Sequence, residues 1–377
     1  MKMLVTSIRS AIFPLVSILS FTVIAAAQSG RVQQTPTPRP DDDTVRIHTE
    51  EIKLNVLAFD ENGQFFRDVT ANDLVITENN ILHQPASVRR LAANVLIVMD
   101  TGGEMRSVKS LDKTRSVARA VVEALRPGDS VALLQYSDKP EIVGEWTSDK
   151  GQMLTAIKRT NFGRRSTFVD GLRLATDFLL TNPRENKHLV LITDGTDSSG
   201  RSSAKFEAMQ RLLATDISVH VLSYTSMELA DIEPRTKTVT NQPPPRALPD
   251  EVVNQLPNDV KIAAQRPKVG PTINTDRKIL KTMRSRKSDL EVSQQQLEKL
   301  AENTNGEFLA PDSTDEMIDK SALVARMIDS TYVVTYTPKI PVVETRGIAE
   351  RNIAVTSKRL GLVVQARRKL IITSAKK

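Results

Sequence analysis

The chain has 377 residues, of which 40% are hydrophobic, enough to bury the cores of two or three domains. Its formal net charge of +7 is mild for this length, and an aromatic content of 4% argues against stacking surfaces for single-stranded nucleic acid. The chain contains no cysteine, which excludes disulfides, thiolate metal sites and a cysteine nucleophile.

The N-terminal segment has the layout of a secretory signal peptide. Lys2 and Arg9 give it a positive start, residues 11–27 are uncharged and mostly apolar, and three alanines end this run before Gln28. We therefore expect residues 1–27 to direct the protein to the periplasm, the cell surface or the medium. The alternative is an uncleaved anchor helix, because the run is close to the shortest length that spans a bilayer. No later segment is apolar enough to cross a membrane.

The next part of the chain changes from a linker to β-structure. Residues 28–44 are polar and rich in proline, which predicts a flexible linker. Residues 45–92 show the period-two alternation of strands, and Asn62-Gly63 is a strong hairpin signal. So short a β region cannot form a complete sandwich by itself, so its strands need partners from elsewhere in the chain.

From residue 93 the pattern alternates between strands and helices. The apolar runs at 93–99 and 188–193 are typical of central parallel strands that are buried on both faces. Segments with helical spacing alternate with such strands, and residues 139–148 indicate an antiparallel edge strand. This alternation predicts an α/β domain with a mostly parallel sheet over residues 93–337.

A segment at 226–288 interrupts that rhythm. It contains three consecutive prolines and a basic run, and its apolar periodicity is weak. We expect a largely disordered insertion, with a short helix near residues 277–283. Such a segment either docks an acidic partner or an anionic surface, or serves as a solvated linker.

The C-terminal residues 338–377 contain further strands. They are the natural partners for residues 45–92. We therefore expect a small β-sandwich made from both ends of the chain, with the α/β domain inserted between them.

Acidic side chains follow two of the buried strands. Asp100 comes after the first and Asp194 after the fourth, and Thr167 begins a helix whose loop belongs to the same edge. Ligands of parallel α/β sheets bind beyond the carboxyl ends of the strands. Two carboxylates and a hydroxyl that converge there suit a hard cation such as Mg²⁺.

These residues resemble a known motif. Asp100-Thr101-Gly102-Gly103-Glu104, Thr167 and Thr193-Asp194-Gly195 are similar to the metal-ion-dependent adhesion site of von Willebrand factor type A domains, whose pattern is D-x-S-x-S, a distant Thr and T-D-G. The resemblance implies a doubly wound, Rossmann-like sheet and a site where Mg²⁺ or Mn²⁺ bridges the protein to a carboxylate of its partner. The terminal strands resemble those of the exported "VWFA-related" family of Acidobacteria.

The motif departs from the family pattern at two positions. Gly102 stands where the family has its first serine, so one hydroxyl ligand is lost, and Glu104 replaces the second serine with a longer, charged group. Asp100, Glu104 and Asp194 would repel one another without a cation, which favours a bound ion. The alternative is a degenerate site that binds no metal, in which Asp100 and Asp194 only form hydrogen bonds with the loops.

Three further residues at this edge are candidate contacts for a partner, namely Thr101, Ser166 and Asp197. Loop aspartates such as Asp197 are more often turn formers.

No enzymatic constellation is present in the sequence. The four histidines lack metalloprotease spacing, and neither G-x-S-x-G nor a phosphate-binding loop occurs. We therefore expect an exported binding, adhesion or scaffold protein that is not an enzyme and contacts a protein partner, not nucleic acid, through an acidic side chain of that partner. The alternative is a regulatory or metal-binding subunit of an envelope enzyme complex.

Overall fold

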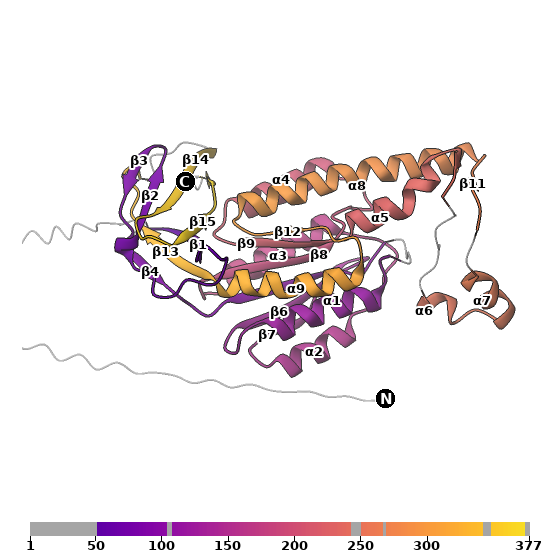
Figure 1. Cartoon of the computed structure of the whole chain (residues 1–377), viewed down its shortest axis with the longest axis horizontal. Helices are drawn as coiled ribbons and strands as arrows, with labels where there is room; N and C mark the ends of the chain where they lie inside the picture. The colour runs from indigo at the N-terminus through magenta and orange to yellow at the C-terminus, as the bar shows by residue number, and fades with distance from the viewer. Residues whose placement is uncertain (1–50, 104–107, 243–249, 267–268, 342–347, 374–377) are drawn as a thin grey trace, which may run out of the picture. The chain divides into compact units, whose positions relative to one another are not determined.

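A mostly parallel sheet is the centre of the larger part of the protein (Figure 1). The computed structural model describes residues 51–103, 108–242, 250–266, 269–341 and 348–373, so the predicted signal peptide and linker lie outside the described residues. In these ranges the sheet has the strand order β12-β9-β8-β5-β6-β7. Its strands are β5 (Asn94–Asp100), β6 (Ser130–Tyr136), β7 (Pro140–Thr147), β8 (Lys187–Thr193), β9 (Ser218–Ser223) and β12 (Phe308–Leu309). All neighbours are parallel except β7, which runs antiparallel to β6 at the edge.

Helices cover both faces of this sheet. The side chains of its central strand, β5, belong alternately to the two hydrophobic cores between the sheet and these helices. Val95, Ile97 and Met99 belong to the core that contains α1 (Leu111–Ala124), α2 (Lys150–Arg159) and α9 (Thr314–Asp329). Leu96 and Val98 belong to the core that contains α3 (Phe168–Thr181), α4 (Ser202–Leu213) and α8 (Arg277–Asn303). The doubly wound α/β fold predicted from the sequence is confirmed.

Two small antiparallel sheets form a β-sandwich from the two ends of the chain. Their strand orders are β15-β1-β13-β4 and β16-β14-β2-β3 among the described residues. The strands are β1 (Ile52–Phe59), β2 (Leu74–Glu78), β3 (Ile81–His83), β4 (Ser87–Arg89), β13 (Thr331–Tyr336), β14 (Ile348–Ser357), β15 (Val363–Ala366) and β16 (Lys369–Thr373), and a single turn of 3₁₀ helix, η1 (Ala71–Asp73), precedes β2. One core joins both sheets through Leu54, Ile76, Val334 and Ile353. Strand β15 pairs with β1 in the first sheet, and β14 pairs with β2 in the second. Residues from the two ends of the chain therefore share each sheet.

One boundary differs from the sequence-based prediction. The pattern assigned residues up to 337 to the α/β domain, whereas β13 lies in the sandwich between β1 and β4. All six residues of β13 are buried because it is a central strand covered on both faces, and this makes it resemble the strands of the parallel sheet.

The insertion also differs from the expectation, since its described parts form regular elements. These are α5 (Thr225–Ile232), η2 (Glu233–Thr236), β10 (Val239–Thr240), α6 (Asp250–Val253), α7 (Asn258–Gln265) and β11 (Thr272–Ile273), and α8 continues as one helix of 27 residues. The apolar periodicity of α8 is weak because polar side chains such as Ser293 and Arg286 occupy its inward positions. The prediction of a largely disordered segment was therefore wrong for these parts.

Candidate functional site

The two predicted aspartates meet at the carboxyl edge of the sheet. Strands β5 and β8 run in parallel register, with Met99 opposite Ile192, so Asp100 and Asp194 emerge side by side. This edge is the right-hand end of the sheet in Figure 1. Both carboxylates are buried, each with 1% exposure.

The ammonium of Lys109 lies between these carboxylates. Its Nζ donates to Asp100 Oδ2 at 2.8 Å and to Asp194 Oδ2 at 2.9 Å. Ser110, the next residue, caps α1 by accepting a hydrogen bond from the backbone N–H of Lys113, which fixes where the chain turns into the helix. Burial alone would lower the pKa of Lys109, but the surrounding carboxylates outweigh it and raise that pKa above its ordinary value. Lys109 is therefore positively charged, and its ammonium lies between the carboxylates of Asp100 and Asp194.

A second cation, Arg286 of α8, supports one of the two aspartates. Its guanidinium donates to Asp194 Oδ2 at 3.2 Å, to Glu228 Oε2 at 2.6 Å and to Thr196 Oγ1 at 2.8 Å. Burial opposes ionisation of Asp194, but Lys109 and Arg286 together hold its pKa well below the usual range.

The other two carboxyl groups of the cluster have raised pKa values. Burial and repulsion from Asp194 raise the pKa of Asp100, because it has Lys109 as its only cationic partner in the described residues. Burial, followed by the charge of Asp194, raises the pKa of Glu228 to about 7. The three acids and two cations therefore form one electrostatic unit whose members ionise differently.

The hydroxyl at this edge comes from Ser166 and not from Thr167. Ser166 Oγ lies 3.4 Å from Asp100 Oδ2 and donates to the carbonyl of Thr196 at 3.0 Å. Thr167 Oγ1 donates instead to the carbonyl of Ser137 at 3.0 Å, so it secures the start of α3. The sequence-based choice of Thr167 as a ligand was one residue away from the hydroxyl that reaches the acids.

The remaining predicted residues have structural contacts. Thr101 is 3% exposed and its hydroxyl donates to the carbonyl of Tyr136, which leaves little of it for a partner. Asp197 accepts hydrogen bonds from the backbone N–H groups of Val169 and Ser199, both at 2.9 Å, so it ties this loop to the first turn of α3. Glu104 lies outside the described residues.

The arrangement does not fit the predicted divalent cation. The protein's own ammonium fills the space between Asp100 and Asp194. Gly102 brings no hydroxyl, and a Cβ added there would lie 1.8 Å from the carbonyl oxygen of Arg165, so no serine fits without a shift of the backbone. In the described ranges, no group of three acidic or histidine side chains is placed to hold a metal. The ammonium of Lys109 lies between the two carboxylates that the sequence predicts as metal ligands, and binding of Mg²⁺ or Mn²⁺ stays a prediction.

This doubly wound domain, with its pair of carboxylates at the carboxyl edge, belongs to a recognised class. Residues 95–196 match the family model of the von Willebrand factor type A domain, a protein-interaction module. The matched range runs from β5 to Thr196 and contains Asp100, Lys109, Ser166 and Asp194. The chain therefore carries a von Willebrand factor type A domain. No curated protein is significantly similar to the chain in sequence.

Solved structures with similar folds share little sequence with this chain. The conserved hypothetical protein BatB from Bacteroides thetaiotaomicron has 19% identity and a TM-score of 0.37, over 63% of this chain and 98% of that protein. An aerotolerance-related membrane protein from Bacteroides fragilis has 17% identity and a TM-score of 0.38, over 62% and 98%. A von Willebrand factor type A protein from Catenulispora acidiphila has 11% identity and a TM-score of 0.42, over 88% and 75%. At these levels the similarities add nothing to the fold already described.

Three members of the cluster were missed from the sequence, namely Lys109, Glu228 and Arg286. Glu228 and Arg286 lie in the segment taken as disordered, so nothing indicated that they face the sheet. Lys109 had a usable signal, because the loop after Asp100 has lost a hydroxyl at Gly102 and carries a cation a few residues later.

Proposed function

We propose that this protein is an exported, non-enzymatic binding module that meets a protein partner at the carboxyl edge of its central sheet. The observation that supports this proposal most is the position of Lys109 between Asp100 and Asp194. Its ammonium balances the buried acids from within the chain, so the edge keeps its structure without a divalent cation. Binding of the partner is then independent of metal.

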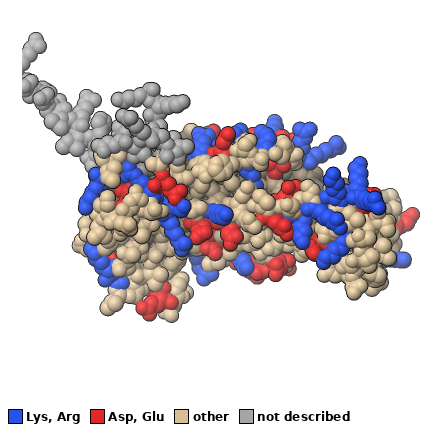
Figure 2. Space-filling view, turned by 90° about the horizontal axis from the view of Figure 1, so that it is seen from above, with Lys and Arg blue, Asp and Glu red and all other residues tan. Residues whose placement is uncertain are grey.

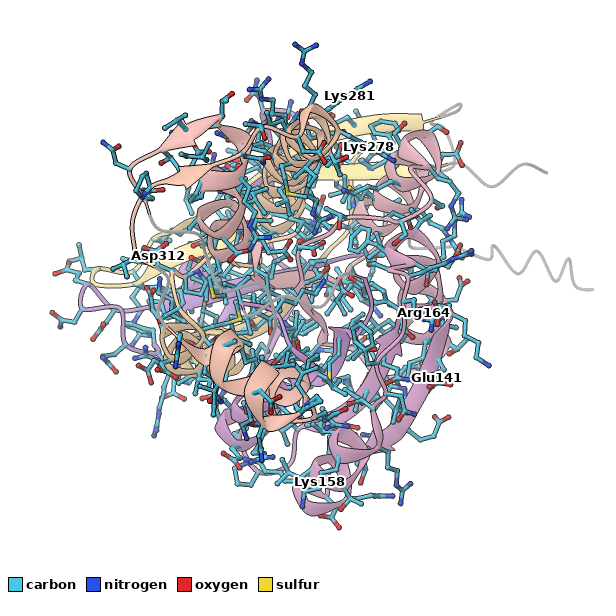
Figure 3. The ribbon with its side chains drawn as sticks, turned by 90° about the vertical axis from the view of Figure 1, so that its right-hand side faces the viewer. Glu141, Lys158, Arg164, Lys278, Lys281 and Asp312 are labelled. Atoms are coloured by element: carbon cyan, nitrogen blue, oxygen red, sulfur yellow. The ribbon has the colours of Figure 1, made fainter. Side chains whose placement is uncertain are left out.

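The surface around this edge is basic. Arg164 and Arg165 are exposed in the loop before α3, and Lys278 and Lys281 are exposed on the first turns of α8. Figure 3 looks onto this end of the protein and shows Lys278 and Lys281 at the top and Arg164 at the side. In Figure 2, blue side chains gather at the same right-hand end. Positive charge steers an acidic partner toward the edge and raises its rate of association.

Export is part of the same proposal and rests on the N-terminal segment of residues 1–27. Within the described residues, no helix has the length and hydropathy of a membrane span. Mass spectrometry of the protein recovered outside the cytoplasm tests this part. A mature chain that begins at Gln28 supports cleavage, and an intact N-terminus in the membrane fraction contradicts it.

Site-specific cross-linking tests the binding edge. A photo-reactive amino acid replaces Arg164 in one full-length variant and Arg184 in a matched one. Arg184 is also an exposed loop arginine, but it precedes β8 at the opposite edge. We expect a defined protein adduct from position 164 that persists in a metal chelator and is absent from position 184. Equal adducts from both positions, or loss of the adduct in chelator, contradict the proposal.

The identity of the captured protein separates the two functional classes. A non-catalytic surface protein supports the binding or scaffold role, whereas an enzyme whose activity changes on binding supports a regulatory subunit.

A further inference from the structure

A pocket between α4 and α8 adjoins the acidic cluster. Its volume is about 240 Å³, and three basic side chains line it, from Arg201, Lys205 and Arg286. Thr196, which follows Asp194, lines it as well. The pocket therefore shares Arg286 and Thr196 with the cluster but opens beside it.

Lys205 is the unusual member of this lining because the carboxylates that act on its buried ammonium, those of Asp194, Asp197 and Asp289, do so from beyond ion-pair distance. It is 9% exposed. Its Nζ donates to Ser293 Oγ at 3.2 Å and lies 5.3 Å from the ring centre of Phe168. Both of these partners are neutral, and Lys205 makes no ion pair within the part of the chain that the structure describes. Burial lowers the pKa of Lys205 to about 8. An unpaired buried charge is costly, so a ligand that neutralises it would gain free energy.

The other charges of the pocket are largely satisfied. Arg286 is bound to Asp194 and Glu228. Arg201 pairs with Asp170 at 2.8 Å and contacts Asp197 at 3.6 Å. One carboxylate, Asp289, stands exposed at the rim and forms no ion pair with Lys205 in the described residues. The pocket thus contains one positive charge, that of Lys205, which lacks a direct anionic partner.

The start of α4 adds to the attraction for an anion. Gly200 and Ser202 line the pocket, and the N-cap residue Arg201 gives the helix no side-chain cap. The backbone N–H groups of a first turn carry a partial positive charge, which adds to that of a nearby cation.

We propose that this pocket binds a single carboxylate group, held by the ammonium of Lys205 at the N-terminal end of α4. The inference rests on the proposed function for its source, an aspartate or glutamate side chain of the protein partner. One carboxylate matches the one unpaired charge. A phosphate dianion would bring a second negative charge close to Asp197 and Asp289, so the pocket favours a carboxylate over phosphate.

The titration of Lys205 itself provides the first test. Isotope-labelled lysine in the full chain is followed by NMR against pH, and Lys205→Met assigns the signal. Without ligand, we expect Lys205 to titrate near pH 8, because burial lowers its pKa. We expect acetate, and a short peptide with one glutamate, to raise this midpoint, because an anion stabilises the ammonium. The matched glutamine peptide should leave it in place. A midpoint unmoved by both carboxylates, or moved as far by inorganic phosphate, overturns the inference.

Matched charge removals provide the second test. Lys205→Met and Lys299→Met each delete one ammonium, but Lys299 is exposed on α8 outside the pocket. We expect Lys205→Met to weaken binding of the glutamate peptide by about tenfold or more, and Lys299→Met to change it far less. Equal losses would mean general attraction to a basic surface and would overturn the inference.

The failures of the two proposals are distinguishable. If carboxylates do not shift Lys205 while the adduct at position 164 persists, the pocket inference fails and the proposed function stands. If acetate shifts Lys205 but the adduct is absent, the pocket binds a free carboxylate and the proposed protein partner at the edge is wrong.

Discussion

Replacement of Lys109 by alanine removes the ammonium that two buried carboxylates share. Breaking a buried ion pair by deleting one partner costs about 3–5 kcal/mol, because the remaining charges stay desolvated. Asp194 keeps Arg286, whereas Asp100 loses its cationic partner, so we expect a loss of ~3 kcal/mol in the free energy of unfolding. Urea denaturation at neutral pH, followed by circular dichroism, measures this value. Lys158→Ala is the control, since that exposed ammonium should contribute less than about 0.5 kcal/mol.

The same variant reveals whether the protein's ammonium stands in for a metal. Once Lys109 is removed, Asp100 and Asp194 face each other with space for a cation between them. We expect Mg²⁺ or Mn²⁺ to stabilise Lys109→Ala in a saturable way, by about 2.7 kcal/mol at a hundredfold excess over the dissociation constant. The wild-type protein should not respond to either ion.

Two results would refute this reasoning. One is an unchanged stability of Lys109→Ala, which would mean that the ammonium does not hold the acids together. The other is stabilisation of the wild-type protein by Mg²⁺ that disappears in the Asp100→Ala, Asp194→Ala double variant. The cation site predicted from the sequence would then be real, and the position of Lys109 would be secondary to it.

Three further changes have definite expected outcomes. Gly102→Ser restores a hydroxyl of the adhesion motif, but its Cβ would lie 1.8 Å from the carbonyl oxygen of Arg165. Urea denaturation should therefore show a loss of about 1–3 kcal/mol or more in the free energy of unfolding. Calorimetry should show no gain of Mg²⁺ binding. Glu228 has a pKa of about 7 in the folded protein and 4.5 as its ordinary value, so it holds its proton more tightly in the folded state. Its contribution to stability should therefore fall as pH rises from about 4.5 to 7. The fall amounts to about 3 kcal/mol at most, and Glu228→Gln should abolish it in denaturation curves taken across that range. Asn305 joins the sandwich to the α/β domain, because its side-chain amide donates to the carbonyl of Asn55 at 2.9 Å, and its φ is +59°. Asn305→Ala should lower the free energy of unfolding by about 1–3 kcal/mol in the same assay. Asn305→Gly should lower it less, because glycine tolerates that φ.

The central sheet could be predicted because burial leaves a nearly continuous apolar run in its central parallel strands, β5 and β8. In β5, residues 95–99 are all apolar and Asp100 follows them. Both the strand and the polar group at its carboxyl end are therefore visible in the sequence. The same signal misassigned β13, since a central strand of a sandwich is as fully buried as one of a parallel sheet. Burial alone does not say which sheet a strand joins.

The lining of the site could be predicted only in part. Asp100 and Asp194 follow directly from the strand ends, but the neighbouring hydroxyl depends on where α3 begins, and one residue separates Ser166 from Thr167. The partners Arg286 and Glu228 come from elements whose contacts with the sheet are polar. Because periodicity arguments detect apolar faces, such elements look like solvated linkers.

The loss of the family's hydroxyl and the presence of Lys109 are two aspects of one arrangement. A bound metal would need oxygen ligands around it, whereas an ammonium needs acceptors only along its own N–H bonds, and Asp100 and Asp194 supply two of these. In the metal-independent binding proposed above, a partner's carboxylate would meet no metal at the edge. Lys205 offers such a group a buried positive charge beside Arg286, which also holds Asp194. A carboxylate that enters the pocket therefore adds a negative charge next to the cluster itself. Occupancy of the pocket should raise the pKa of Glu228 further and retain its proton, which couples binding to the acids at the strand ends.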